Sequence, residues 1–235
     1  MTEIRAIVPV KRFAEAKTRL APLFTAAERA MLAMAMLEDV LAALTASAAV
    51  SEVVLATNDP VAQPLAVSFS ARIFDAAPVD SLNEAISSAL GGTRNTSEAA
   101  LIVPGDLPLL TPDIVDKAAE LTCPHGVVLS PACRDGGTNL IGLCPWDAIT
   151  PNFGEGSFAR HVERARQAGI VPFILDNASL GLDIDTPADI APLIERGSGT
   201  RTLAFLRELN VSGRLSVFAG SAAIHDARLG AMVSP

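Results

Sequence analysis

Short apolar runs alternate with longer amphipathic segments along most of the chain, and this alternation constrains the fold more than any other feature. Strands are predicted at residues 4–10, 52–56, 71–74, 99–103, 126–130, 140–144 and 170–175. Helices are predicted at residues 25–44, 112–120 and 153–168, and near 80–84 and 185–189. Such alternation indicates βαβ units and an α/β fold with a mainly parallel sheet. Right-handed crossovers would bring the loops that follow the strands to one edge of the sheet.

Length and composition favour one domain. The chain has 235 residues, half of them hydrophobic, so it can bury a sizeable core. We expect a single domain over residues 1–219 and a poorly ordered tail over residues 220–235. The formal charge of −8, without any basic block, disfavours nucleic-acid binding.

The cellular setting is predicted from cysteine usage and hydropathy. The three cysteines have no metal-ligand spacing and read as reduced thiols, so we expect a cytoplasmic protein. The N-terminus shows no signal-peptide pattern. The longest apolar segment, residues 31–50, is interrupted by Glu38 and Asp39 and has helical periodicity. It predicts a core helix and no membrane span.

The apolar run 99–103 delivers one carboxylate, Asp106, after Pro104 and Gly105. In open α/β sheets, ligands bind beyond the carboxyl ends of the strands. An Asp there, next to a glycine that permits close approach, is a candidate metal ligand. The alternative is a turn residue that caps the helix beginning near Thr111. This stretch alone supports both interpretations equally.

A second acidic element is Asp183-Ile-Asp185. In a strand, residues two apart face the same side, so both carboxylates would point to one place. They would repel each other unless a cation lay between them, and Mg²⁺ is held by one or two carboxylates together with substrate phosphates. The alternative is that Asp185 caps a helix with Pro187 in its first turn. Capping does not require Asp183, and the pairing with Asp106 favours a metal site.

Two of the three lysines, Lys11 and Lys17, follow the first strand together with Arg19. This cluster is either a site for a nucleotide triphosphate or a solvated surface. The chain has neither a Walker A motif nor a GxGxxG fingerprint. A cationic loop combined with separated aspartates suits metal-dependent transfer at a nucleotide phosphate. Lys17 and Asp106 are the candidate catalytic residues.

Two glycine-rich segments, 136–139 and 153–157, form a third candidate element. Glycines expose backbone N–H groups, and a hydroxyl at a helix N-terminus adds a donor where the helix dipole favours anions. Thr138 and Ser157 are therefore candidates to hold a small phosphorylated acid. A turn and a helix cap explain these segments equally well.

Asn83 and His161 have weaker signals. Asn83 stands at the start of a predicted helix and either reads a base edge or caps the helix, and capping is slightly favoured. His161 lies one turn after Ser157, but a solitary histidine is more often structural.

Taken in order, the motifs resemble one family. They are V-P-V-K-x5-K-x-R-L, L-N-E-A, V-P-G-D-L-P-L-L, G-G-T-N, F-G-x-G-S-F-x2-H and L-D-I-D-T-P-x-D. This series resembles the CofC/FbiD guanylyltransferases of coenzyme F420 biosynthesis over about residues 4–190. The resemblance implies a three-layer nucleotidyltransferase fold, nucleotide-diphospho-sugar transferase-like, with a mixed, mainly parallel sheet flanked by helices. It also implies transfer of GMP from GTP to 2-phospho-L-lactate, phosphoenolpyruvate or 3-phospho-D-glycerate, with release of pyrophosphate.

The resemblance assigns roles by position. Two Mg²⁺ ions would be held by Asp106, Asp183 and Asp185. Lys17 would contact the phosphates, assisted by Lys11 and Arg19. The acceptor acid would be held by Thr138, Gly154 and Ser157. Asn83 would lie at the guanosine side, although Ser81 replaces the glycine that the family often has there.

The implied reaction is an in-line attack by the acceptor's phosphate oxygen on the α-phosphorus of GTP. That oxygen is already anionic, so no general base is required. Besides GTP and the acid, the resemblance suggests hand-over of the product to the next enzyme of the pathway.

Other functions are weighed against this one. Another nucleotidyltransferase of this fold, of the molybdenum-cofactor or sugar-phosphate type, usually has a glycine-rich loop after the first strand, which Pro9-Val-Lys11 replaces here. A metal-dependent glycosyltransferase normally has its DxD in mid-chain. A non-catalytic nucleotide-binding protein is the alternative from another class. The sequence does not select among the three acids and does not give the oligomeric state.

Overall fold

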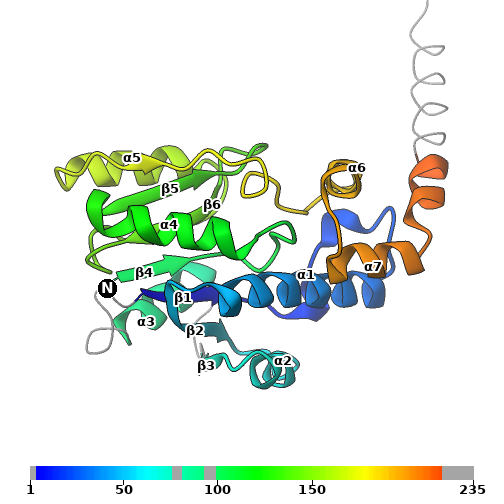
Figure 1. Cartoon of the computed structure of the whole chain (residues 1–235). Helices are drawn as coiled ribbons and strands as arrows, with labels where there is room; N and C mark the ends of the chain where they lie inside the picture. Colours follow the sequence, from blue (N-terminus) through cyan, green and yellow to red (C-terminus); the bar gives the residue numbers. More distant parts are fainter. Residues whose placement is uncertain (1–3, 76–80, 93–98, 219–235) are drawn as a thin grey trace, which may run out of the picture.

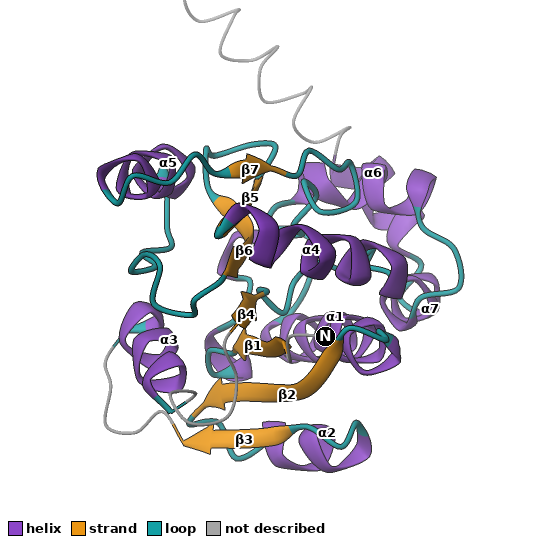
Figure 2. Ribbon diagram, turned by 60° about the vertical axis from the view of Figure 1, so that its left-hand side comes forward, coloured by secondary structure: helices purple, strands orange, loops and turns teal. Residues whose placement is uncertain are grey.

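Seven strands pair into one sheet within residues 4–75, 81–92 and 99–218, the part of the chain that the computed structural model describes. They are β1 (Ile4–Pro9), β2 (Val50–Thr57), β3 (Arg72–Asp75), β4 (Ala99–Ile102), β5 (Val127–Pro131), β6 (Thr138–Leu143) and β7 (Phe173–Ile174). Their order is β3-β2-β1-β4-β6-β5-β7, and only β6 runs antiparallel to its neighbours, β4 and β5 (Figure 2). The predicted mixed, mainly parallel sheet is confirmed.

Helices cover both faces of this sheet. They are α1 (Ala26–Ala46), α2 (Ala62–Ser68), α3 (Leu82–Gly91), α4 (Pro112–His125), α5 (Ser157–Gln167), α6 (Pro187–Arg196) and α7 (Arg201–Glu208), with short 3₁₀ turns η1 (Phe13–Glu15) and η2 (Thr18–Leu20). Figure 2 shows α3 and α5 on one side of the sheet and α1, α2 and α4 on the other. The arrangement has the three layers that the sequence predicts.

The two faces of the sheet are buried in separate hydrophobic clusters. Ile7, Ile102 and Ile141 pack on the side of α3 and α5. Their strand neighbours Val8 and Leu101 pack on the side of α1 and α4. A strand covered on both faces is apolar at nearly every position, which explains why these strands read as almost continuous apolar runs. The exception in β1 is the buried Arg5, which pairs with Glu52.

The long helix α1 begins as its sequence predicts. The hydroxyl of Thr25 accepts from the backbone N–H of Glu28 at 3.3 Å, and the Glu28 carboxylate accepts from the Thr25 N–H at 2.8 Å, which completes a capping box. The helix extends to Ala46 and packs into the core. Among the described residues, no helix combines the length and apolar character needed to cross a membrane.

The structure corrects two predictions made from the sequence. The predicted strand over residues 170–175 shortens to Phe173–Ile174, because only these residues pair with β5. Beyond residue 197 the sequence pattern weakens, yet residues 201–208 form α7, which lies along α1 (Figure 1). The predicted tail over residues 220–235, like Asp80, lies outside the described residues. The single domain ending at residue 219 remains a prediction.

Helix α7 depends on a side chain from α1. The buried carboxylate of Asp39 accepts from the backbone N–H groups of Arg201 and Thr202 at 2.8 and 2.9 Å, and from the Thr202 hydroxyl at 2.7 Å. Thr200 adds a cap by accepting from the Leu203 N–H at 3.2 Å. The free N–H groups in the first turn of α7 therefore find their acceptor more than 160 residues earlier in the sequence. A local sequence pattern cannot predict such a contact.

We predict that Asp39→Ala lowers the free energy of unfolding by about 2–3 kcal/mol, because it strips the cap from α7 and leaves the buried Thr202 hydroxyl unpaired. The neighbouring substitution Glu38→Ala is the control. It removes only a half-exposed ion pair with Arg201, at 3.0 Å, and should cost less than about 1 kcal/mol. Urea unfolding of both variants measures the difference, and equal losses would contradict the capping role.

Candidate active site

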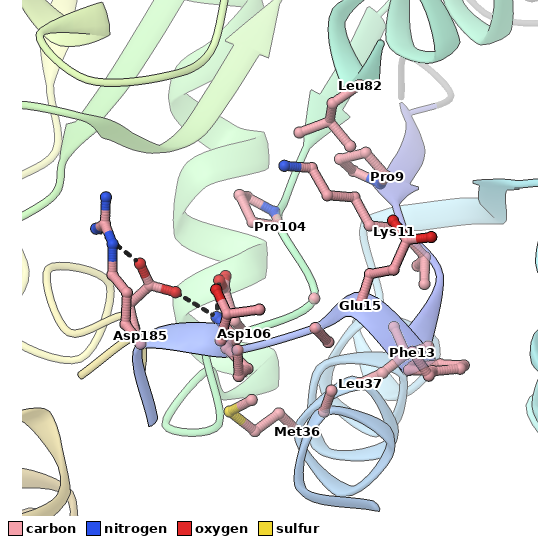
Figure 3. Close-up of a pocket in the computed structure, with 17 residues that line it drawn as sticks. Pro9, Lys11, Phe13, Glu15, Met36, Leu37, Leu82, Pro104, Asp106 and Asp185 are labelled. Atoms are coloured by element: carbon pink, nitrogen blue, oxygen red, sulfur yellow. Dashed lines mark hydrogen bonds and ion pairs between the residues drawn. The ribbon is translucent and has the colours of Figure 1, made fainter. Parts of the chain in front are cut away.

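The segments that the sequence marks as functional meet at one edge of the sheet. Parallel strands β1 and β4 end there, and antiparallel β6 begins there. A pocket of about 360 Å³ opens at this edge (Figure 3). Its charged lining comes from three separate parts of the sequence: Lys11, Glu15, Lys17, Arg19, Asp106 and Asp185.

Lys17 lies at the centre of the charged groups. Its Nζ donates to Asp106 Oδ2 at 2.6 Å and to Asp185 Oδ1 at 3.2 Å. Arg19 donates to the other Asp185 oxygen at 3.2 Å. The Lys17 side chain is only 10% exposed, and its backbone is left-handed, with φ of 55°. A non-glycine residue in that conformation costs about 1 kcal/mol or more, so the surrounding contacts must hold it there.

Ionisation at the site is set by burial and by these contacts. Burial opposes the charge on Lys17, but Asp106 and Asp185 outweigh it and raise the pKa of the ammonium. Burial likewise opposes ionisation of Asp185, yet the adjacent Lys17 charge holds the pKa of this carboxyl below its usual value. For Asp183, burial and then the Asp106 charge raise the pKa. Lys17 therefore compensates the charges of Asp106 and Asp185, whereas burial and the Asp106 charge disfavour ionisation of Asp183.

Asp106 is not a helix cap. Helix α4 is capped by Thr111, whose hydroxyl accepts from the Ile114 N–H at 3.4 Å. A Cβ at Gly105 would lie 3.1 Å from Leu37 Cδ1, so a glycine here lets the chain pass close against α1. The Asp106 side chain is left to face Lys17. The capping interpretation of Asp106 is therefore wrong.

The Asp183–Asp185 segment does not lie in a strand, so the predicted strand geometry is wrong. The Ile184 N–H donates to the Asp106 carbonyl at 3.2 Å and so ties this segment to the Asp106 turn. Ile184 is fully buried while both aspartates are half-buried, so the alternation of burial persists without strand pairing. The backbone N–H of Asp185 donates to the Asp189 carboxylate at 3.0 Å, and Asp189 also takes part in the capping box of α6.

The lysine loop is fixed by a residue that the sequence analysis did not single out. Asp59, after β2, accepts from the Phe13 N–H at 2.8 Å and from the Val61 N–H at 2.9 Å. Phe13 is itself buried in the core. In the sequence, Asp59-Pro60 after a buried strand is typical of an ordinary turn. Its hydrogen-bond partner, Phe13, lies 46 residues away, so no local pattern indicates this contact.

Lys11 differs from Lys17. It is exposed, extends across the pocket between Pro104 and Leu82 (Figure 3), and has no recorded ion pair among the described residues. A second pocket of about 440 Å³ shares Lys11 and Leu82 with the first and continues past Asn58 at the end of β2. Lys11 thus lies at the boundary between the two pockets.

Thr138 and Ser157 are brought together, as predicted, but their side chains are buried. The Ser157 hydroxyl donates to Thr138 Oγ1 at 3.1 Å, and Thr138 Oγ1 lies 2.9 Å from His161 Nδ1. Gly154, exposed and with φ of 127°, precedes them in the loop. A hydrogen bond from the Phe158 N–H to the Gly136 carbonyl, at 3.0 Å, joins the two glycine-rich segments. Their contact with a ligand remains a prediction.

Asn83 does not cap its helix. Ser81 is the cap and accepts from the Glu84 N–H at 3.2 Å. The Asn83 amide instead pairs with both backbone groups of Phe153: its Oδ1 accepts at 2.7 Å and its Nδ2 donates at 3.2 Å. The slightly favoured capping interpretation is therefore wrong, and the contact with guanosine remains a prediction.

Strand β6 connects the two glycine-rich segments to the carboxylates. Thr138 faces His161 on one side of the sheet, while the next residue, Asn139, donates to Asp183 Oδ1 at 3.2 Å and to the Leu180 carbonyl at 2.8 Å on the other. Arg134, just before this strand, pairs with Asp189 at 3.0 Å. Neither Asn139 nor Arg134 was singled out, because each pairs with a residue more than 40 positions away.

Comparison with known proteins identifies the family. The family described as "Guanylyl transferase CofC like" matches residues 4–222. The chain belongs to this family. The family resemblance of the sequence is confirmed, and the chain is a nucleotidyltransferase.

Relatives of this CofC-like chain have three different acceptors in their names. It is 41% identical to a phosphoenolpyruvate guanylyltransferase of Sphaerobacter thermophilus, over 82% of this chain and 93% of that one. It is 38% identical to a 3-phospho-D-glycerate guanylyltransferase of Phenylobacterium zucineum, over 87% and 95%. It is 34% identical to a 2-phospho-L-lactate guanylyltransferase of Methanothermobacter thermautotrophicus, over 87% and 90%.

Solved structures share the fold of the CofC-like chain. A predicted nucleotide-diphospho-sugar transferase of Desulfovibrio desulfuricans G20 superposes with a TM-score of 0.73 at 22% identity, over 93% of this chain and 99% of that one. A CMP:2-keto-3-deoxy-manno-octonic acid synthetase superposes with a TM-score of 0.55 at 15% identity, over 82% and 97%. The predicted nucleotide-diphospho-sugar transferase-like fold is confirmed.

We predict that Lys17→Met destabilises the protein in a pH-dependent way. Near neutral pH it should lower the free energy of unfolding by only about 1–2 kcal/mol, because a third of the Asp185 side chain is exposed and water screens the ion pair. The lowered pKa of Asp185 stabilises the fold above the pKa of the unfolded state, and this contribution disappears as the pH falls. The gap between wild type and variant should therefore narrow on acidification.

Urea unfolding at neutral and acidic pH measures this gap. Lys11→Met is the matched control, because it removes the same charge from an exposed lysine that has no ion pair with the part of the chain the structure describes, and it should change stability by less than about 0.5 kcal/mol. A gap that stays constant with pH would mean that Lys17 contributes packing, not charge.

Proposed function

We propose that this chain transfers GMP from GTP to a phosphorylated three-carbon acid and releases pyrophosphate, as a step of coenzyme F420 biosynthesis. The observation that carries the proposal is the Lys17 ammonium held between Asp106 and Asp185 at the mouth of a pocket. The relatives named above support the substrate class: phosphoenolpyruvate, 3-phospho-D-glycerate or 2-phospho-L-lactate. The same names do not favour a pterin or sugar phosphate as acceptor, or a non-catalytic protein.

The cations of the pocket would bind the triphosphate. Lys17 lines the pocket, Lys11 has no ion pair with the described residues, and Arg19 has a planar donor group that matches phosphate oxygens. The second pocket, on the far side of Lys11, would receive the nucleoside. Binding of this kind places the α-phosphate beside Asp106 and Lys17.

No general base is required, because the attacking phosphate oxygen is already anionic. His161, the histidine next to the acceptor segments, does not fit such a role. It is fully buried, and burial together with Arg164 and Arg160 lowers its pKa to about 4. The residues of this chain would therefore act by orienting the two substrates and neutralising charge.

The carboxylates fit Mg²⁺ by the chemistry of their donors. Asp106, Asp183 and Asp185 offer hard oxygen ligands, and burial together with the Asp106 charge raises the pKa of Asp183, whose ionised form a cation would favour. Mg²⁺ typically takes only one or two carboxylates and completes its shell with substrate phosphates. Bound Mg²⁺ would neutralise charge on the phosphates.

The acceptor acid would lie at the start of α5, near Thr138, Gly154 and Ser157, where backbone N–H groups and the helix dipole favour an anion. Hand-over of the product to a following enzyme, and a cytoplasmic location, are part of the same proposal and rest on the sequence.

The acceptor test is direct. We expect incubation with GTP and Mg²⁺ to release pyrophosphate with at least one of 2-phospho-L-lactate, phosphoenolpyruvate and 3-phospho-D-glycerate, and not with GTP alone. A sugar phosphate serves as the control acceptor. Release with the sugar phosphate only, or with none of the acids, would contradict the proposed function.

The metal assignment has a readout that does not depend on turnover. Because Lys17 occupies the oxygens that a metal would use, we expect Lys17→Met to bind Mn²⁺ at least about tenfold more tightly than wild type in the absence of nucleotide, measured by electron paramagnetic resonance. Lys11→Met removes the same charge without touching the carboxylates and should produce a much smaller gain. Equal gains in both variants would show a general field effect and contradict competition at the carboxylates.

A further inference from the structure

His161 is a buried titratable residue that the proposed chemistry does not use. We propose that it is a positioning residue for the acceptor acid: as the Nδ1–H tautomer it turns the Thr138 hydroxyl so that the hydroxyl proton is presented to the anionic group of the acid. The inference rests on the proposed function and adds which partner donates the hydrogen bond between Thr138 and the acid. Three steps lead to it.

The first step fixes the tautomer. His161 Nε2 lies 2.8 Å from the backbone nitrogen of Asn152, and that nitrogen carries a hydrogen that can only be donated. Nε2 must therefore accept, so in the neutral ring the proton is on Nδ1. Nδ1 lies 2.9 Å from Thr138 Oγ1 and donates to it.

The second step concerns Thr138. Its hydroxyl oxygen also accepts from the Ser157 hydroxyl at 3.1 Å. A hydroxyl has two acceptor lone pairs and one hydrogen. Both lone pairs are occupied, so only the hydrogen remains, and no acceptor for it is recorded among the described residues. Thr138 is then a pure donor, which suits a carboxylate or phosphate and disfavours a neutral donor group.

The third step is the rigidity of the loop before α5. Besides the His161 bond to Asn152, the Asn83 amide clamps both backbone groups of Phe153, and the Phe153 ring packs edge-on against the imidazole at 5.6 Å between centroids. Arg164 adds a bond to the Thr150 carbonyl at 2.6 Å. The loop therefore holds the imidazole in one orientation.

The His161 imidazole stays neutral near neutral pH. The charged groups that act on it are Arg160 and Arg164 on its own helix, which, after burial, lower its pKa to about 4. From the other elements it meets the Thr138 hydroxyl, the Asn152 backbone and the Phe153 ring. Protonation would turn Nε2 into a donor facing the Asn152 N–H, and the donor chain would be interrupted.

Nuclear magnetic resonance of histidine side-chain nitrogens tests the tautomer without any substrate. The chain has only three histidines, so His161→Gln assigns the signal. We expect a neutral Nδ1–H form near neutral pH, with an Nδ1 shift that changes in Thr138→Val. An Nε2–H tautomer, or a His161 signal indifferent to Thr138→Val, would overturn the inference.

Kinetics test the function of the tautomer with a matched pair of variants. In His161→Asn the amide nitrogen can replace the Nδ1 donor to Thr138, whereas in His161→Gln the longer side chain can replace only the Nε2 acceptor for Asn152. We expect His161→Gln to raise the KM for the acid about tenfold or more and His161→Asn to raise it less than about threefold, with the KM for GTP unchanged in both. A merely structural histidine would affect both variants and both substrates alike, which would overturn the inference.

A double variant isolates the path through Thr138. In the Thr138→Val background, His161→Gln should add no further increase in the KM for the acid, because the hydroxyl that it orients is gone. Additive effects of the two substitutions would place the action of His161 elsewhere. Lack of turnover by wild type with every acid would refute the proposed function instead, and the resonance experiment would still decide the tautomer.

Discussion

The ion pairs of Lys17 are the contact on which the arrangement of the site depends. One ammonium joins the loop after β1 to the loop after β4 and to the segment before α6, across 89 and 168 residues of sequence. Three carboxylates at one sheet edge would otherwise repel one another in a half-buried place. The left-handed backbone of Lys17 is the local cost of this bridge, and the buried Phe13, fixed by Asp59, keeps the loop in position.

The sheet could be predicted from the sequence because its signal is local. A strand covered on both faces is apolar at nearly every position, and the runs around Ile7 and Leu101 have this pattern, with Arg5 as the exception in β1. The position of Asp106 at the sheet edge could be predicted for the same reason, since it follows such a run after Pro104 and Gly105. Family resemblance then supplied the relation between Asp106 and the late acidic pair, which spacing alone left open.

What could not be predicted depends on partners far away in the sequence. Helix α7 reads weakly because its cap is Asp39, a residue of α1. Asn83 has the position of a helix cap, but Ser81 takes that role and leaves its amide to the Phe153 backbone. The Asp183 segment has the burial alternation of a strand, but its backbone neighbour is the turn at Asp106, whose carbonyl accepts from the Ile184 N–H, and not a strand. In each case a tertiary contact outweighs the local pattern.

The alternation along β6 gives the two halves of the site a common mechanical element. Thr138 points to His161 and Asn139 points to Asp183, so two consecutive residues carry a contact to each half. A shift of one residue in the pairing of β6 would exchange these two side chains between faces and uncouple both contacts together. The register of β6 therefore sets the spacing between the Thr138–His161 contact on one face of the sheet and the Asn139–Asp183 contact on the other.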